Sequence, residues 1–217
     1  MEKATNNSLI GKIADSLGIN KKFHQYKETN IDPLDKALIS PVEGKIVHIG
    51  HISADGILIS KNNKEISLKE LIGENYKLFI NGKYINIYLS PLNEHYWITP
   101  DDGKFIYTQK NTGTAVLPVF VGLESLFGIE MFSKAVKKNA SIGSVFQTAK
   151  FSIAMIAVGS LNVNRIYADY EENKYYKKGT SCGYFNIGSS MLLCFPDYLK
   201  ILVEKDEKIK IGQRIVL

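Results

Sequence analysis

ISPVEGKIV (Ile39–Val47) is the stretch that decides the fold, because it recurs 59 residues later as ITPDDGKFI (Ile98–Ile106). In each copy a proline fixes the entry into a corner, and a glycine permits the tight turn before a strand. A third stretch, VEKDEKIKIGQRIVL (Val203–Leu217), has a charged turn, a glycine and a final strand pattern. Two copies are too few for a solenoid. Repeated short strands with Pro-Gly corners therefore predict one compact, folded-over β domain.

The residues around these copies also favour strands. The chain of 217 residues contains 12 Tyr and 10 Phe with many Ile and Val, which are enriched in β-sheets. Apolar and polar residues alternate along KYINIYLSP (Lys83–Pro91), and the preceding Asn81-Gly82 is a hairpin signal. FSIAMIAVG (Phe151–Gly159) is typical of a buried strand. We therefore predict a mainly β (α+β) domain over residues 36–217.

The N-terminal region differs, because its apolar residues follow a helical spacing. In SLIGKIADSLGI, residues 8–19, the side chains of Leu9, Ile13 and Leu17 lie on one face of a predicted helix. This amphipathic helix either docks on the core, which is the commoner arrangement, or lies in a membrane interface. The polar residues that follow it predict a linker. Residues 1–35 are thus expected to form a helix and a linker ahead of the β domain.

Composition and charge argue against several classes of protein. A net charge of +5 and a pI near 9.0 describe a mildly basic surface without the aromatic-basic cluster of an RNA module, so nucleic acid is not an expected partner. Cys182 and Cys194 have no spacing typical of a metal site or a disulfide framework, so no metal is expected. The N-terminus lacks the apolar run of a signal peptide, and the longest apolar run is too short to span a membrane. A cytoplasmic protein is the expectation.

Three polar features of this β pattern are candidates for chemistry. Glu43 offers a carboxylate on the first Pro-Gly corner, and His95 follows the strand that ends in YLSP. Gly188-Ser189 opens the apolar run of FNIGSSMLLCF (Phe185–Phe195). Small residues such as these usually form an ordinary turn. The alternative is that the Gly188-Ser189 bond itself reacts.

Four motifs, taken in order, resemble those of the phosphatidylserine decarboxylase family. The family's Ser-Pro-Ala-Asp-Gly corresponds to Ser40–Gly44, and its Leu-Ser-Pro followed by a histidine corresponds to Leu89–His95. Its Val-Gly-Ser corresponds to Val158–Ser160, and its Gly-x-Phe-x-x-Gly-Ser-Thr or Gly-Ser-Ser corresponds to Gly183–Ser190. Each motif alone is weak, but four in sequence over roughly residues 36–200 are fairly specific. The resemblance implies a fold of the barrel-sandwich hybrid type.

The resemblance also implies self-cleavage between Gly188 and Ser189. The serine hydroxyl attacks the glycine carbonyl, the resulting ester eliminates, and hydrolysis leaves a pyruvoyl group derived from Ser189. By the same resemblance His95 and Glu43 are catalytic residues, with Glu43 at the position of the family's aspartate. The two chains that result from self-cleavage are expected to remain associated, because the strand after Ser189 holds the small chain in the sheet.

The reaction implied by the resemblance is decarboxylation of phosphatidylserine to phosphatidylethanolamine, with the pyruvoyl carbonyl as the electron sink. The expected setting is the cytoplasmic face of a membrane, with peripheral contact to anionic lipid. Two alternatives are a non-catalytic, uncleaved relative that binds a lipid or protein partner, and a pyruvoyl decarboxylase of another amino-acid-like amine.

The chain departs from the family pattern at three places. The family aspartate is Glu43 here, one methylene longer. The second histidine of many members falls on Ile98. A family Asn-Glu-Arg aligns with Asn139-Ala140-Ser141, where both charges are absent. These departures favour the non-catalytic alternative, whereas the intact Gly188-Ser189 and His95 oppose it.

Overall fold

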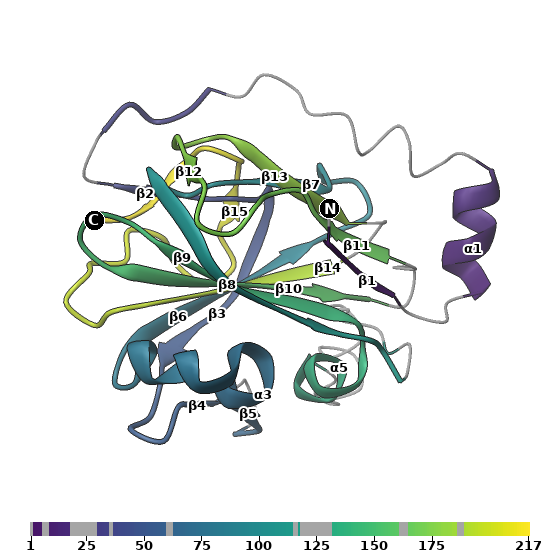
Figure 1. The fold of residues 1–217 in the computed structure, drawn as a ribbon, viewed down its shortest axis with the longest axis horizontal. Helices are drawn as coiled ribbons and strands as arrows, with labels where there is room; N and C mark the ends of the chain where they lie inside the picture. Colours follow the sequence, from purple (N-terminus) through teal and green to yellow (C-terminus); the bar gives the residue numbers. More distant parts are fainter. Residues whose placement is uncertain are drawn as a thin grey trace.

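An eight-stranded antiparallel sheet with strand order β12-β8-β9-β10-β14-β6-β3-β15 forms the centre of the fold (Figure 1). A four-stranded sheet has the order β1-β11-β13-β7, and β16-β2 and β4-β5 form two small pairs.

This computed structural model describes residues 2–5, 9–17, 30–34, 37–59, 63–114, 117, 132–160, 165–185 and 189–217. The strands are β1 (Glu2–Thr5), β2 (Leu38–Ile39), β3 (Gly44–His51), β4 (Ile57–Ile59), β5 (Glu65–Ser67), β6 (Lys83–Leu89), β7 (Tyr96–Ile98), β8 (Gly103–Asn111), β9 (Ser141–Gln147), β10 (Ser152–Gly159), β11 (Arg165–Ala168), β12 (Tyr175–Tyr176), β13 (Ser181–Phe185), β14 (Ser189–Phe195), β15 (Lys208–Ile209) and β16 (Arg214–Val216). The helices are α1 (Leu9–Ser16), α3 (Leu68–Ile72), α5 (Phe132–Lys138) and the 3-10 helix η1 (Gly73–Phe79).

The repeated sequence produces an internal pseudo-twofold symmetry. β3 and β8 both begin at the glycine of the repeat, and the ladders β3–β6 and β8–β9 shift register at the same place in the two copies. The two corners also bind each other reciprocally. Ile39 N donates to Pro100 O at 3.1 Å, and the equivalent Ile98 N donates to Pro41 O at 3.0 Å. The two copies of the repeat are therefore structural partners.

Two further segments complete this symmetry. β15 pairs with the start of β3 as β12 pairs with the start of β8, and β16 pairs with β2 as β13 pairs with β7. Gly212 (φ 80°) and Gly179 (φ 81°) occupy equivalent turns, in the left-handed region that favours glycine. Gly212 N donates to Ser40 O at 3.0 Å, and Gly179 N donates to Thr99 O at 2.9 Å. Equivalent strands therefore follow in the same order from the two edges of the sheet: β12, β8, β9 and β10 from one edge, and β15, β3, β6 and β14 from the other. The pseudo-twofold axis lies between β10 and β14.

The core fills both faces of the eight-stranded sheet, because successive side chains of a strand point to opposite faces. One face packs against the four-stranded sheet, where Trp97 and Phe185 meet with ring centroids 4.6 Å apart. The other face packs against α3, η1 and α5, with Leu71 and Val136 among the buried residues. Strands covered on both faces are largely apolar, and β14 is buried over its whole length.

The mainly β, α+β class predicted from the sequence is confirmed. The strand patterns of residues 83–91 and 151–159 correspond to β6 and β10. The predicted hairpin at Asn81-Gly82 is wrong. Asn81 does form a turn, with φ 58°, but the 3-10 helix η1 precedes it, and the ladder partners of β6 are β3 and β14.

The N-terminal helix is present as α1, and its predicted apolar stripe is exposed. Leu9 is 72% exposed, Ile13 49% and Leu17 69%, and α1 stands away from the sheets in Figure 1. In the described part of the chain these three side chains are thus not packed on the core, and contact with a membrane stays a prediction. The sequence did not indicate β1, which pairs with β11 in the four-stranded sheet. Of the described helices, none is long and apolar enough to cross a bilayer.

Candidate active site

Ser189 lies at the start of β14, between two neighbouring strands. It pairs with Gly159 of β10 on one side and with Leu89 of β6 on the other. Its side chain is fully buried, and among the described residues its Oγ has no hydrogen-bond partner. A buried hydroxyl left unpaired costs about 1–3 kcal/mol, so it requires an explanation. Gly188, the other half of the predicted cleavage site, lies outside the described residues.

His95 lies just before β7 and is also fully buried. Its Nδ1 is 2.6 Å from the carbonyl oxygen of Asn93. Because a carbonyl can only accept, this contact assigns a proton to Nδ1, and in the neutral ring Nε2 then carries the lone pair. The carbonyl of His95 accepts from Phe185 N at 2.7 Å. This bond ties the histidine to the end of β13, four residues before Ser189.

Glu43 lies in the first Pro-Gly corner, immediately before β3. Its Oε1 accepts a hydrogen bond from Asn93 Nδ2 at 2.7 Å. Ser40 Oγ donates to Val42 O at 2.6 Å and so fixes the corner that presents this carboxylate. The two predicted residues Glu43 and His95 are therefore linked through Asn93, which contacts the carboxylate with its side chain and the imidazole with its main chain.

Asn93 is the site residue that the sequence interpretation missed. It closes a turn that follows β6, in which Asn93 N donates to Ser90 O at 3.0 Å. Ser90 N and Ser90 Oγ both donate to Asn93 Oδ1 at 2.8 Å. Ser-Pro-x-Asn is a recognisable turn pattern, because serine and asparagine bond nearby backbone and proline fixes φ. That pattern could have directed attention to Asn93.

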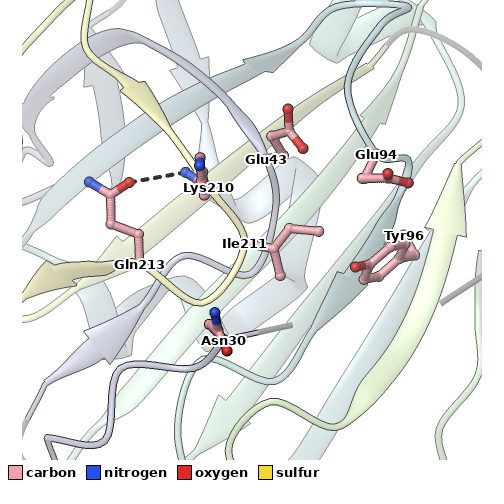
Figure 2. Close-up of a pocket in the computed structure, with 7 residues that line it drawn as sticks. All are labelled: Asn30, Glu43, Glu94, Tyr96, Lys210, Ile211 and Gln213. Atoms are coloured by element: carbon pink, nitrogen blue, oxygen red, sulfur yellow. Dashed lines mark hydrogen bonds between the residues drawn. The ribbon is translucent and has the colours of Figure 1, made fainter. Parts of the chain in front are cut away.

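A cavity of about 470 Å³ opens beside Glu43. Figure 2 shows Lys210 and Gln213 on one side of it and Glu94 and Tyr96 on the other. Gln213 Oε1 accepts from Lys210 N at 3.0 Å, which fixes one wall. The cavity therefore presents carboxylates and an amine from separate segments of the chain. Its lining residues are Asn30, Glu43, Glu94, Tyr96, Lys210, Ile211 and Gln213.

Two positions of the family motifs have structural roles here: Ile98, which departs from the pattern, and Asn139, which keeps the family's asparagine. Ile98 is fully buried in a cluster with Ile39 and Ile211, so an apolar contact stands where many members have a second histidine. Asn139 is buried, and its Nδ2 donates to Gly159 O at 2.8 Å. Gly159 is the ladder partner of Ser189, so Asn139 supports the strand end opposite the serine.

Asp102 is the counterpart of Glu43 in the second copy of the repeat, but it is engaged elsewhere. Lys177 Nζ donates to it at 2.8 Å and Lys178 N at 2.7 Å. These two bonds, in that order of effect, lower the pKa of Asp102. One copy of the corner thus carries a surface ion pair, whereas the other carries the Glu43–Asn93–His95 chain.

A buried serine without a partner is available to react once a base can take its proton. A carboxylate-linked histidine is the usual means of providing one. These features define the class as a mainly β domain that holds a buried serine and a histidine linked to a carboxylate; whether these residues act together stays a prediction.

Comparison with known proteins identifies the family. Residues 21–217 match the phosphatidylserine decarboxylase family, and the chain belongs to it. A phosphatidylserine decarboxylase proenzyme of Geobacillus sp. (strain WCH70) is 30% identical over 193 residues, covering 85% of this chain and 70% of that protein. The proenzymes of Halalkalibacterium halodurans and Anoxybacillus flavithermus are 28% and 27% identical, covering 82% and 91% of this chain and 67% and 78% of their own.

Proposed function

We propose that this chain cleaves itself at Gly188-Ser189 and then decarboxylates phosphatidylserine to phosphatidylethanolamine. The observation that carries the proposal is the buried, unpaired hydroxyl of Ser189, at the position of the family's cleavage serine. Membership of the family supports it, as do relatives named proenzymes, a word for proteins that mature by processing.

In this proposal His95 is the base, because the proton on Nδ1 leaves a lone pair on Nε2. His95 takes the proton of Ser189 Oγ, and the oxygen attacks the Gly188 carbonyl. The Gly188–Ser189 C–N bond breaks, the serine nitrogen gains a proton, and an ester joins the two segments. Loss of the Ser189 Cα proton breaks the Cβ–O bond and frees the Gly188 carboxylate. Water then releases ammonia from the dehydroalanine and leaves the pyruvoyl group.

The site fits a pyruvoyl group derived from Ser189. Such a group is no larger than the serine it replaces, and the serine hydroxyl makes no bond that would be lost. The ladders of β14 to Gly159 and Leu89 would hold it in place. When formed, it supplies the electron sink for loss of CO2. In this proposal Glu43, His95 and Asn93 would hold and move protons for it.

The two cleavage products would stay together, because the small chain is built into the sheet. It would contain β14, which pairs with both β10 and β6, and also β15 and β16, which pair with β3 and β2. The side chains of β14 are buried throughout. Separating the chains would therefore expose a central part of the core to water.

Intact-mass spectrometry of the purified protein tests this proposal. We expect a large fragment and one of 29 residues under denaturing conditions, and a single co-eluting species in native chromatography. The small fragment should react with a hydrazide and lack a free N-terminal amine, because a pyruvoyl group has replaced it. A single full-length mass after long incubation, with no hydrazide reaction, would instead identify a non-catalytic relative. Cleavage without turnover of phosphatidylserine would point to another amine as substrate.

We further propose that the protein works at the cytoplasmic membrane face, docked through α1. The exposed stripe of Leu9, Ile13 and Leu17 supports this, as does the exposed Lys12 between them. Two hydrogen bonds, Gly113 N to Thr5 O and Thr114 N to Lys138 O, connect the end of β1 to the end of α5. The exposed lysines of α5 thus belong to a helix whose end is joined to the end of β1, and each basic residue near an anionic surface contributes about 1 kcal/mol. These are Lys134, Lys137 and Lys138.

Replacing Leu9, Ile13 and Leu17 together by serine should weaken binding to phosphatidylserine-containing vesicles more than about tenfold, or about 1.4 kcal/mol. The reason is that these side chains can no longer bury apolar surface in the interface. Binding of the unmodified chain should also fall as salt rises. Co-sedimentation measures both effects.

The matched control replaces three exposed apolar residues of other segments, Leu78, Tyr198 and Leu202, by serine. This control variant should bind vesicles as the unmodified chain does. Equal binding by the α1 variant and the control would show that α1 is not the membrane contact.

A further inference from the structure

We propose that Asn93 is a positioning residue that couples the Glu43 carboxylate to the His95 imidazole. This inference rests on the proposed function, in which His95 takes the proton of Ser189. It adds a residue that was not among the predicted site residues. It also explains how the Glu43 carboxylate can influence the histidine.

The contacts of Asn93 require an amide at this position. Its Oδ1 accepts from Ser90 N and Ser90 Oγ, both at 2.8 Å, so this end must be an acceptor. Its other end, Nδ2, donates to Glu43 Oε1 at 2.7 Å. Asparagine is a short side chain with an acceptor and a donor on the same carbon. Aspartate would keep the bonds to Ser90, but it would place an oxygen against the oxygen of Glu43.

The main chain of Asn93 then fixes the histidine. Because the side chain is held from two sides, its carbonyl is held as well, and this carbonyl accepts from His95 Nδ1 at 2.6 Å. The tautomer with the lone pair on Nε2 is thereby selected. When His95 takes a proton its ring becomes positive, and the negative charge of Glu43, bonded to the same residue, favours that state.

This arrangement accounts for two departures from the family pattern at once. Ile98, at the place of the second histidine, is packed in an apolar cluster and offers a carboxylate nothing to bond. Glu43 is one methylene longer than aspartate, and its carboxylate bonds Asn93 instead. Both departures therefore fit a site in which the carboxylate bonds Asn93.

A swap of the two interacting groups tests the coupling. Asn93→Asp should slow self-cleavage more than about tenfold, because two carboxylates face each other and the bond is lost. Glu43→Gln should also slow it, because the charge is lost. The double variant Glu43→Gln with Asn93→Asp restores a donor facing an acceptor and one negative charge, so cleavage should recover to within about threefold of the unmodified rate. The time course of fragment appearance by intact mass gives all four rates.

The matched control is Asp102→Asn, which removes the carboxylate at the equivalent corner of the second copy. It loses an exposed ion pair with Lys177, and such pairs are worth little. Its cleavage rate should therefore equal that of the unmodified chain. The proposal would be overturned if the fold decrease in the cleavage rate of the double variant equalled the product of the two single decreases. It would also be overturned if Asn93→Asp cleaved at the unmodified rate.

A spectroscopic measurement separates this inference from the proposed function. In the Ser189→Ala background, 15N NMR of the His95 ring should show a protonated Nδ1 and an unprotonated Nε2. Adding Asn93→Asp should produce a mixture of the two tautomers. A single unchanged tautomer would overturn the role of Asn93, whatever the rates. Failure of the unmodified chain to cleave would remove the proposed function, while this measurement would still test the positioning role.

Discussion

Ser189→Ala is expected to abolish self-cleavage completely. No hydroxyl remains to attack the Gly188 carbonyl, and no other group can generate the pyruvoyl group at that position. The purified variant should remain a single species of 24.3 kDa by intact mass after days at room temperature. It should have no decarboxylase activity. Fragments that end at residue 188 in this variant would show that Ser189 is not the nucleophile.

The same substitution should also stabilise the fold. This effect is measured between two uncleaved chains, one with Ser189 and one with alanine at that position. In a slowly cleaving background, Ser189→Ala deletes a buried hydroxyl that has no partner, so the free energy of unfolding should rise by about 1 kcal/mol or more. The control is Ser190→Ala, because Ser190 is equally buried in β14 but does not carry such an unpaired buried oxygen. Urea unfolding followed by circular dichroism compares the two. A larger gain for Ser190→Ala would contradict the assignment.

His95→Asn is expected to produce the second largest effect, a decrease in the cleavage rate of about 10²- to 10⁴-fold, which is typical for loss of a general base. The asparagine amide can still donate to the Asn93 carbonyl as Nδ1 does, so the turn should keep its shape. The variant lacks the lone pair of Nε2. The time course of fragment appearance gives the rate, and circular dichroism confirms the fold.

The control for His95→Asn is His51→Asn. His51 lies at the exposed end of β3, 3.6 Å from Asp197, far along the strand from the Glu43 corner. This variant should cleave like the unmodified chain. If His95→Asn also cleaves at that rate, then another group takes the proton of Ser189, and the Glu43–Asn93–His95 chain only supports the turn.

The sequence predicted the parts of the fold that depend on local pattern. The Pro-Gly corners, the buried run of β10 and the helix α1 follow from residue type and spacing, and these elements are present. Asn81-Gly82 was misread, because a turn signal does not reveal that a 3-10 helix rather than a strand precedes it. β1 is too short to show a period, and only its pairing with β11 defines it.

The candidate residues of the site could be predicted from sequence motifs, but the link between Glu43 and His95 could not. Ser189, His95 and Glu43 come from motifs that can be read along the chain, and whether they act together stays a prediction. Asn93 was missed because its importance arises from contacts with residues both near and far in the sequence, at Ser90 and Glu43. Residues 203–217, which contain β15 and β16, have a structural equivalent in the segment that contains β12 and β13. This equivalence was missed because the two segments share strand pairing and not sequence.

The internal symmetry has a consequence for where the chain is cut. In the second copy, β9 and β10 are joined directly by residues 148–151. In the first copy, the equivalent strands β6 and β14 are separated by residues 90–188, which contain the whole second copy. The second copy is thus nested inside a hairpin of the first, and Ser189 is where the chain returns from it. The proposed scission falls on the seam between two modules, so it would break neither one internally.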